Sequence, residues 1–333
     1  NACRWRAREH RRMSAHAAAA MSNSVLAALN RLSDGHTRRT AWNELTAFAE
    51  RLDAQRLPAF LACLHATNDR YTIACRRGAI QLYGRLGSMH PQLLAPHLPK
   101  IADYLVTRLR DKDSTRELRE ACAAALGALV AELTELCPDA PAAVLRQLLP
   151  ALGETLEPVQ LGGALCLACV VTSAGELPAH LIARACQALH RPLLGHCCVG
   201  AHAAMLHAAA ALLKHSPLSS AAHAPQLLPA LLAACVAPDW GVRRAAADAL
   251  HALVAHLTGV AEAHQRRVGD ALQQLRGDKH RTVRDAALAA LAALAALTSM
   301  GGAAAGAGGA GRKESIAELR ERMRRDRAAL RAA

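Results

Sequence analysis

Cysteine and histidine are the residues in this sequence whose spacing comes closest to a chemical motif. Cys166 and Cys169 form a CxxC pair, and His196 stands directly before Cys197 and Cys198. A structural zinc site needs four such ligands, and no second CxxC or HxxxH pair completes either group. A redox CxxC opens a helix in a βαβ unit, whereas Cys166 lies inside an apolar helical stretch. We therefore predict that the CxxC cysteines are buried core residues and that the chain binds no metal or cofactor.

Other motifs that would indicate catalysis are missing from the sequence. Neither a GxxxxGK[ST] phosphate loop nor a GxSxG nucleophile elbow occurs, and GxGxxG-like runs lie only near residues 300–311. A dinucleotide-binding glycine loop follows a strand and opens a helix, and no strand pattern precedes this segment. No pair of carboxylates stands apart from the acidic residues expected on turns and helix surfaces. We therefore predict that the protein is not an enzyme.

Arginine, in contrast, recurs at regular intervals in a short pattern of an apolar residue, Arg, any residue, and Ala or Gly. The pattern is centred on Arg76, Arg119, Arg243 and Arg284, with a weaker copy at Arg38. Glycine takes the arginine position in two further copies, at residues 162 and 200. Successive copies lie about 40 residues apart, which is typical of HEAT and armadillo repeats built from two helices per unit.

The elements that position these arginines are predicted to be helices. The sequence is 52% hydrophobic but only 2% aromatic, and its abundant Ala and Leu are strong helix formers. β-Sandwiches and barrels depend on aromatic and β-branched residues, which argues against an all-β fold. We predict an all-α protein, an α-solenoid of about seven HEAT-like helix pairs. The turn inside each pair is expected near residues 34, 68, 112, 157, 196, 239 and 278.

The chain is expected to divide into four parts. Residues 1–20 form a basic leader that we expect to be disordered, and Met21 has the character of a natural start. Residues 21–299 form the HEAT-repeat domain, followed by a flexible Gly/Ala linker over residues 300–311. Residues 312–333 are predicted to form a short basic helix, the beginning of a truncated tail.

The aligned arginines have a structural interpretation. In a solenoid, the turns inside successive helix pairs line one edge. Each arginine enters the second helix of a pair just after a turn aspartate, so Asp and Arg are predicted to form a ladder that locks neighbouring repeats. The ladder residues are Asp34, Arg76, Arg119, Asp239, Arg243, Asp278 and Arg284.

Neighbouring exposed positions on the same turns are the candidates for binding a partner. These are Arg39, Asn68, Arg70, Arg77, Lys112, Trp240, Arg244, Lys279 and Arg281. Trp240 is one of only three tryptophans and lies in a turn, where burial is difficult. It is interpreted either as an interface anchor or as a residue that packs on a neighbouring repeat.

The net charge of +13 is concentrated at the two ends of the chain. Residues 1–20 and residues 312–333 each carry a net +4, a distribution typical of basic arms that contact an acidic polymer or surface. No run of ~18 uninterrupted apolar residues occurs, so no membrane partner is expected. Proteins that bind single-stranded nucleic acids use exposed aromatic residues, which are scarce here. Duplex binding through charge alone is left as an alternative.

A series of segments resembles one known family over about residues 24–297. The segments are residues 29–37, 44–45, 96–101, 108–111, 160–168, 239–246 and 278–285. The most specific of them contains Gly162 and Gly163, because adjacent glycines depart from the general HEAT pattern. The chain is similar to the N-terminal TOG-like HEAT domain of the plant TORTIFOLIA/SPIRAL-two microtubule-associated proteins.

The resemblance implies a non-catalytic protein that binds microtubules or tubulin and regulates cortical microtubule dynamics in the cytoplasm. TOG-like domains contact tubulin through the intra-repeat turns along one edge, which makes the exposed turn residues candidate tubulin contacts. The first turn differs from that of TOG domains proper, because it has Asp34, Gly35 and His36 where those domains carry a tryptophan. The alternative function is a general HEAT-repeat scaffold or adaptor that binds other proteins through the solenoid surface.

Overall fold

The computed structural model describes residues 21–306 of the 333-residue chain. The predicted basic leader (residues 1–20) and the predicted basic tail (residues 312–333) lie outside the described residues. Within residues 21–306 the regular structure is helical, and no strand occurs there. The prediction of an all-α fold is therefore confirmed.

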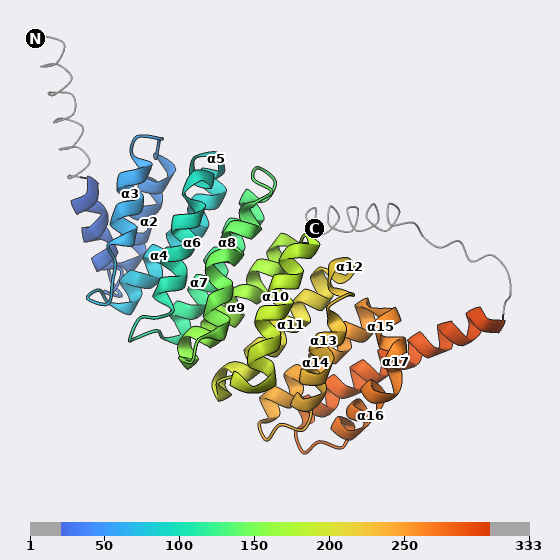
Figure 1. The fold of residues 1–333 in the computed structure, drawn as a ribbon. Coiled ribbons are helices and arrows are strands. Elements are labelled where there is room, and N and C mark those ends of the chain that lie inside the picture. The colour runs from blue at the N-terminus through green and yellow to red at the C-terminus, as the bar shows by residue number, and fades with distance from the viewer. Residues whose placement is uncertain (1–20, 307–333) are drawn as a thin grey trace, which may run out of the picture. The chain divides into compact units, whose positions relative to one another are not determined.

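Seven helix pairs make up the described part of the chain (Figure 1). The first helices of the pairs are residues 21–31, α3 (Leu57–His65), α6 (Leu98–Arg108), α8 (Ala140–Leu148), α10 (Ala179–Arg191), α13 (Ala224–Ala234) and α16 (Gln265–Arg276). The second helices are α2 (Arg38–Glu50), α4 (Ile73–Met89), α7 (Arg116–Leu133), α9 (Glu157–Ala174), α11 (His202–His215), α14 (Trp240–His256) and α17 (Arg281–Gly306). Short helices between pairs are α5 (Pro91–Leu94), η1 (Ala95–His97), α12 (Pro217–Ser220) and α15 (Thr258–Ala263), and η2 (Leu149–Gly153), η3 (Pro192–His196) and η4 (Val199–Ala201) lie inside turns.

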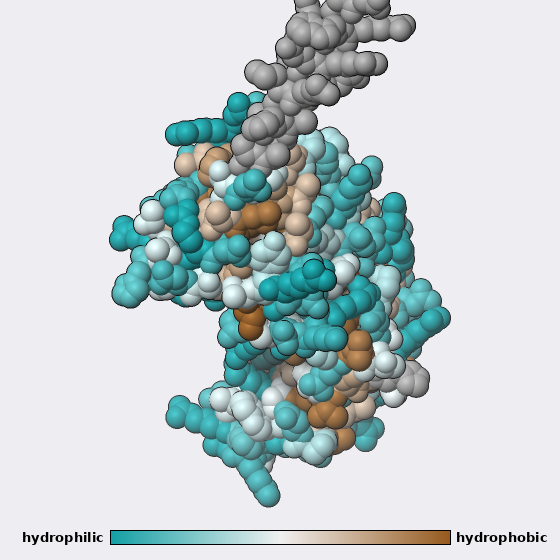
Figure 2. Space-filling view, turned by 90° about the vertical axis from the view of Figure 1, so that its left-hand side faces the viewer, coloured by the Kyte–Doolittle hydropathy of each residue, from teal (hydrophilic) through white to brown (hydrophobic). Residues whose placement is uncertain are grey.

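The helix pairs stack so that each contacts its neighbours in the chain. The second helices α4, α7, α9, α11 and α14 pack in that order, and first helices pack on one another in the same way, as α6 does on α8. Alanine and leucine fill most of the core. Each repeat thus buries its apolar face against the next, which is the predicted α-solenoid. On the face shown in Figure 2, hydrophobic residues appear only as separate patches among hydrophilic ones.

Two adjacent glycines in α9 allow close contacts, Gly162 with the preceding repeat and Gly163 with η2 in the turn of its own repeat. A Cβ atom added at Gly162 would lie 2.7 Å from Cδ2 of Leu109 and 3.2 Å from Cδ of Arg119. At Gly163 an added Cβ would lie 3.2 Å from Cβ of Ala151. Because protein interiors are close-packed, a side chain at residue 162 would displace its neighbours. The glycine in the arginine position of this repeat therefore has a packing cause.

The last helix, α17, continues beyond residue 299, the predicted end of the repeat domain. The described part of the predicted Gly/Ala linker, residues 300–306, belongs to this helix. Composition alone had assigned this segment to a flexible linker. Its three consecutive alanines, however, favour a helix. The chain divides into two compact units, and the boundary between them, at Leu294 and Ala295, lies inside α17.

Two helical segments, Glu157–Ala174 and Arg281–Ser299, are long and apolar enough to cross a membrane by length and composition alone. The first segment is α9, which packs between α7 and α11 and has half of its residues buried. Burial inside the solenoid explains its apolar character, because a core helix needs apolar residues on more than one face.

Candidate interaction edge along the intra-repeat turns

The turns inside the seven helix pairs lie along one edge of the solenoid, the lower edge in Figure 1. We call this row of turns the turn edge. Its members, numbered in chain order, are residues 32–37, 66–72, 109–115, 149–156, 192–201, 235–239 and 277–280. Every residue predicted to contact a partner lies on one of these intra-repeat turns or within the first seven residues of the helix that follows it. The turn edge is therefore the candidate site.

Four of the aligned arginines donate hydrogen bonds to backbone carbonyls of their own turn, five or six residues earlier in the chain. The arginines are Arg38, Arg119, Arg243 and Arg284, and the acceptors are Leu32, Ser114, Ala237 with Pro238, and Asp278 with Lys279. The Nη1 atom of Arg243, for example, lies 2.8 Å from both of its acceptor oxygens. These bonds give partners to backbone carbonyls of the turns and tie each of these four turns to the start of its second helix.

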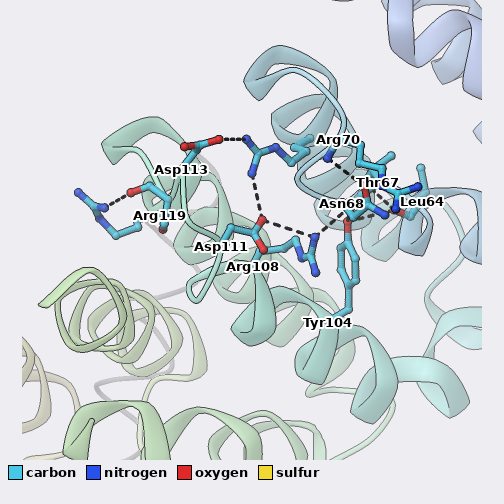
Figure 3. Close-up of polar contacts among 11 residues, drawn as sticks. Leu64, Thr67, Asn68, Arg70, Tyr104, Arg108, Asp111, Asp113 and Arg119 are labelled. Carbon is cyan, nitrogen blue, oxygen red and sulfur yellow. Dashed lines mark hydrogen bonds and ion pairs between the residues drawn. The ribbon is translucent and has the colours of Figure 1, made fainter. Parts of the chain in front are cut away.

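Arg76 makes ion pairs with the third turn, in the next repeat, where Figure 3 shows Asp111 beside Arg108. The side chain of Arg76 is only 2% exposed, and its Nη1 atom lies 3.1 Å from Oδ2 of Asp111 on the third turn. Arg108 approaches the same carboxylate oxygen at 3.4 Å. Asp113, which is 65% exposed, lies 3.8 Å from Arg76. The guanidinium groups of Arg76 and Arg108 therefore share the carboxylate of Asp111, and Asp113 adds a longer, exposed ion pair to Arg76.

Arg108 extends this cluster into the second turn. Its Nη1 atom donates to the carbonyl of Thr67 at 3.1 Å, and its guanidinium lies over the ring of Tyr104, 5.0 Å from the centroid. The hydroxyl of Tyr104 donates to the carbonyls of Leu64 and Thr67. Burial raises the pKa of Tyr104 to about 12, so this hydroxyl keeps its proton at neutral pH. The cluster joins the second and third turns into one rigid unit.

A second ion pair joins the sixth and seventh turns. The Nε and Nη2 atoms of Arg243 lie 2.5 and 3.1 Å from the two carboxylate oxygens of Asp278. This two-point geometry is the strong form of an arginine–carboxylate contact. The hydrogen bond from Arg243 lowers the pKa of Asp278. Trp240, at the start of α14, stacks on His280 of the seventh turn with ring centroids 5.2 Å apart.

Hydrogen bonds join the fourth and fifth turns, and among the described residues no ion pair does; one of the bonds runs from the N–H of Gly200 to the carboxylate of Glu157 at 3.2 Å. Gln160 is fully buried, and its Nε2 atom donates to the carbonyl of Leu152 in the fourth turn at 3.0 Å. Its Oε1 atom accepts from the backbone N–H of Cys198 in the fifth turn at 2.7 Å. Gln160 thus bonds to its own turn and to the next one, as Arg243 does, but it is neutral.

The predicted ladder residues therefore separate into two groups. Arg76, Arg243 and Asp278 make ion pairs between repeats. Asp34, Arg119, Asp239 and Arg284 bond within their own turns instead. The main partner of Arg76, Asp111, and the neutral bridge Gln160 were not identified from the sequence. A spacing signal exists for the charged pairs, because Arg76 and Asp111 are 35 residues apart, as are Arg243 and Asp278.

The predicted contact residues are mostly open to solvent. Those in the exposed class are Arg39, Asn68, Arg70, Lys112, Trp240, Arg244, Lys279 and Arg281, whereas Arg77 is partly buried. Trp240 remains 43% exposed although it stacks on a neighbouring turn, so it meets the geometry of both interpretations. Basic candidates occur on or next to turns one to three and six and seven, and turns four and five contain neither Lys nor Arg.

Exposed apolar side chains occupy the central turns, and the sequence analysis did not single them out. They are Leu156 on the fourth turn, Leu194 and Val199 on the fifth, and Val236 on the sixth. Val199 is 81% exposed. In the sequence, the absence of Lys and Arg from the fourth and fifth turns was the feature that could have indicated an apolar surface there. The turn edge thus has two basic parts separated by an apolar part.

The two cysteines of the CxxC pair lie within helix packing, whereas Cys197 and Cys198 lie in the fifth turn and are partly buried. Cys166 is buried and Cys169 is partly buried in α9. Burial raises the pKa of both thiols, and that of Cys166 lies well above its ordinary value. A thiolate is the form that binds metals and attacks disulfides, and it is disfavoured here. Within residues 21–306, no group of three or more side chains of His, Cys, Asp or Glu is arranged to hold a metal ion.

Comparisons with known proteins agree with this architecture. A family model described as TORTIFOLIA1 N-terminal matches residues 19–296. TORTIFOLIA1-like protein 4 of Arabidopsis thaliana is 30% identical over 265 residues, which cover 80% of this chain and 41% of the relative. The microtubule-associated protein TORTIFOLIA1 of the same plant is 30% identical over 279 residues, which cover 80% and 31% of the two chains. The chain thus spans less than half the length of these relatives.

A solved structure of a karyopherin bound to a SUMO protease has the same kind of fold. Its TM-score is 0.61 at 13% sequence identity, and the match covers 82% of this chain and 29% of the karyopherin. At this identity the likeness concerns the helical solenoid alone.

Proposed function

Because the chain belongs to the TORTIFOLIA1 N-terminal family, we propose that its solenoid binds microtubules without catalysing a reaction and regulates cortical microtubule dynamics in the cytoplasm. The binding surface in this proposal is the turn edge. Its predicted tubulin contacts are the nine residues given above for the turns.

The observation that carries the proposal is the separation of structural from available cations on the turn edge. Arg76 and Arg243 are engaged in ion pairs between repeats, so they hold the turns in a fixed row. Arg70 and Lys112 stand exposed on the second and third turns of that row, outside the ion pairs of the described residues. Cations spaced along a row of joined turns suit a repetitive acidic surface such as the microtubule lattice, because the turn backbone need not be ordered on binding.

The proposed contacts are individually weak. An exposed ion pair contributes about 0.2–1 kcal/mol and is screened by salt. Several contacts on one rigid edge combine, because the first contact raises the effective concentration of the others. The basic segments 1–20 and 312–333 would add attraction of the same kind. Binding is therefore expected to fall steeply as ionic strength rises.

Co-pelleting of the full chain with stabilised microtubules over a salt series tests the proposal. The test variant carries Arg70→Glu, Lys112→Glu and Arg244→Glu, three exposed positions on or next to the turn edge. Arg243 is left intact, because it holds the sixth and seventh turns together. We expect the variant to lose at least about tenfold in affinity, equivalent to 1.4 kcal/mol.

The matched control carries Arg51→Glu, Arg56→Glu and Lys214→Glu. Arg51 and Arg56 are exposed between α2 and α3, and Lys214 is exposed at the end of α11. All three lie away from the turn edge, and the net charge changes by the same amount. We expect the control to pellet like the unmodified chain. Equal losses in both variants would overturn binding through the turn edge, and absence of pelleting of the unmodified chain at low salt would overturn microtubule binding itself.

A second candidate function is a protein scaffold, and the apolar central turns favour it. Leu156, Leu194 and Val199 are exposed on adjacent turns, and apolar patches on soluble proteins mark interaction sites. A triple Ser substitution at these residues separates the two functions. It is expected to leave microtubule pelleting unchanged if the basic turns carry the binding, and to abolish capture of a protein partner if the scaffold function operates.

A further inference from the structure

A small cavity opens between α2 and α4, next to the first turn. Its volume is about 110 Å³, which corresponds to the space of roughly four water molecules in the liquid. Arg38, an aligned arginine, and Arg77, a predicted contact, both line this cavity. It lies at the end of the turn edge where the basic turns begin.

One side of the cavity is apolar. Leu32, the partly buried Trp42 and Gly78 line it. A Cβ atom at Gly78 would lie 2.2 Å from Cδ1 of Leu32, so the absence of a side chain there makes room for this leucine. The indole of Trp42 offers a flat surface on which methylene groups can pack.

The other side of the cavity carries donors. Arg38, Arg77 and Gln81 line it, and an arginine side chain has N–H donors but no acceptor. Arg38 uses its Nε atom on the carbonyl of Leu32 at 3.1 Å, which leaves its terminal nitrogens available. Neither Arg38 nor Arg77 belongs to an ion pair among the described residues, whereas nearby Arg31 and Arg76 both do.

Two guanidinium groups outside the ion pairs of the described residues, beside a half-enclosed apolar wall, favour an anion with an apolar stem. We propose that this cavity is a subsite for a glutamate side chain of an acidic peptide segment. The methylene groups would lie against Trp42 and Leu32, and the carboxylate would accept hydrogen bonds from Arg38 and Arg77. Charge-assisted bonds of this kind are roughly twice as strong as neutral ones. The inference rests on the proposed function, because it assigns one contact of the turn edge with an acidic partner.

The intrinsic fluorescence of Trp42 provides the test. The chain has three tryptophans, so the full chain with Trp5→Phe and Trp240→Phe retains Trp42 as the single emitter. This protein is titrated with a hexaglutamate peptide and, separately, with a hexaglutamine peptide in buffer of near-physiological ionic strength. We expect a saturable change with hexaglutamate and none with hexaglutamine.

Two variants separate the cavity from general charge attraction. Arg77→Gln removes a lining cation and is expected to weaken hexaglutamate binding about tenfold. Its matched control is Arg85→Gln, an exposed residue of the same helix that does not line the cavity, and this change is expected to leave the affinity within about twofold. Ala74→Leu fills the cavity while it keeps every charge, and it is expected to reduce binding like Arg77→Gln. Circular dichroism confirms that each variant is folded.

The outcomes distinguish this inference from the proposed function. Equal losses from Arg77→Gln and Arg85→Gln, or unchanged binding in Ala74→Leu, would overturn the subsite. If hexaglutamate does not bind but the chain still pellets with microtubules, the subsite is refuted and the proposed function stands. If hexaglutamate binds as described but the chain does not pellet, the subsite stands and the proposed function is refuted.

Discussion

Asp111 carries more of the stability of the solenoid than its neighbour Asp113, although both are aspartates of the third turn. The side chain of Asp111 is 9% exposed, and it neutralises Arg76 and Arg108, whose side chains are 2% and 12% exposed. Asp111→Asn keeps the shape of the side chain but leaves Arg108 without a carboxylate partner and Arg76 with only the exposed Asp113. Removing one partner of a buried ion pair typically costs about 3–5 kcal/mol.

Asp113→Asn is the matched control for this substitution. Asp113 is 65% exposed and lies 3.8 Å from Arg76, a geometry that contributes about 0–1 kcal/mol. Arg76→Met should fall between the two, because Asp111 would still be neutralised by Arg108. The structure thus predicts a rank order of destabilisation: Asp111→Asn, then Arg76→Met, then Asp113→Asn.

Urea unfolding followed by circular dichroism measures the three free energies. For an m value of about 3 kcal/mol/M, the Asp111→Asn midpoint should fall by roughly 1 M. Hydrogen exchange should show the loss mainly in α3, α4, α6 and α7, because each repeat of a solenoid contacts only its neighbours. Equal midpoints for Asp111→Asn and Asp113→Asn would refute the reasoning from burial.

Three further predictions concern other junctions of the solenoid. Asp278→Asn should cost about 2 kcal/mol at neutral pH, and because the folded-state pKa of Asp278 is lowered, the difference from the unmodified chain in thermal melts should be constant above about pH 5 and shrink as the pH falls below about 4. Gly162→Ala should destabilise by about 1–3 kcal/mol through overpacking against Leu109, whereas Gly153→Ala, with open space around its Cβ position, should be nearly neutral in urea unfolding. A thiol reagent at neutral pH should modify Cys166 only as fast as the protein unfolds, and labelling within seconds in the folded state would contradict its burial.

The repeat architecture was predictable because helix pairs of similar length leave a periodic trace in the sequence. The arginine pattern places the seven turns close to where the structure has them, since each copy begins a second helix. The extent of α17 was not predictable from composition, because glycine and alanine together suggested a linker. Three alanines that follow an existing helix extend it at little cost.

The partners of the aligned arginines depend on tertiary geometry that a repeat pattern does not specify. Arg76 and Arg119 occupy equivalent positions, yet Arg76 reaches Asp111 while Arg119 bonds to the carbonyl of Ser114 in its own turn. The spacing alone does not decide the partner, because Glu154 stands 35 residues after Arg119 but pairs with Arg110. Likewise, Gln160 takes over a bridging role that a search for charged residues cannot find.

The neutral bridge at Gln160 has a mechanical consequence for a protein built as a row of junctions in series. The preceding junction includes the partly exposed ion pair of Arg110 and Glu154, which salt screens. The junction at Gln160 has no ion pair among the described residues and rests on the amide bonds of Gln160 and on the bond from the N–H of Gly200 to Glu157. A rise in ionic strength should therefore weaken the junction between the third and fourth repeats more than the junction between the fourth and fifth. The residues of each turn therefore determine which junction between repeats loosens first as the salt concentration rises.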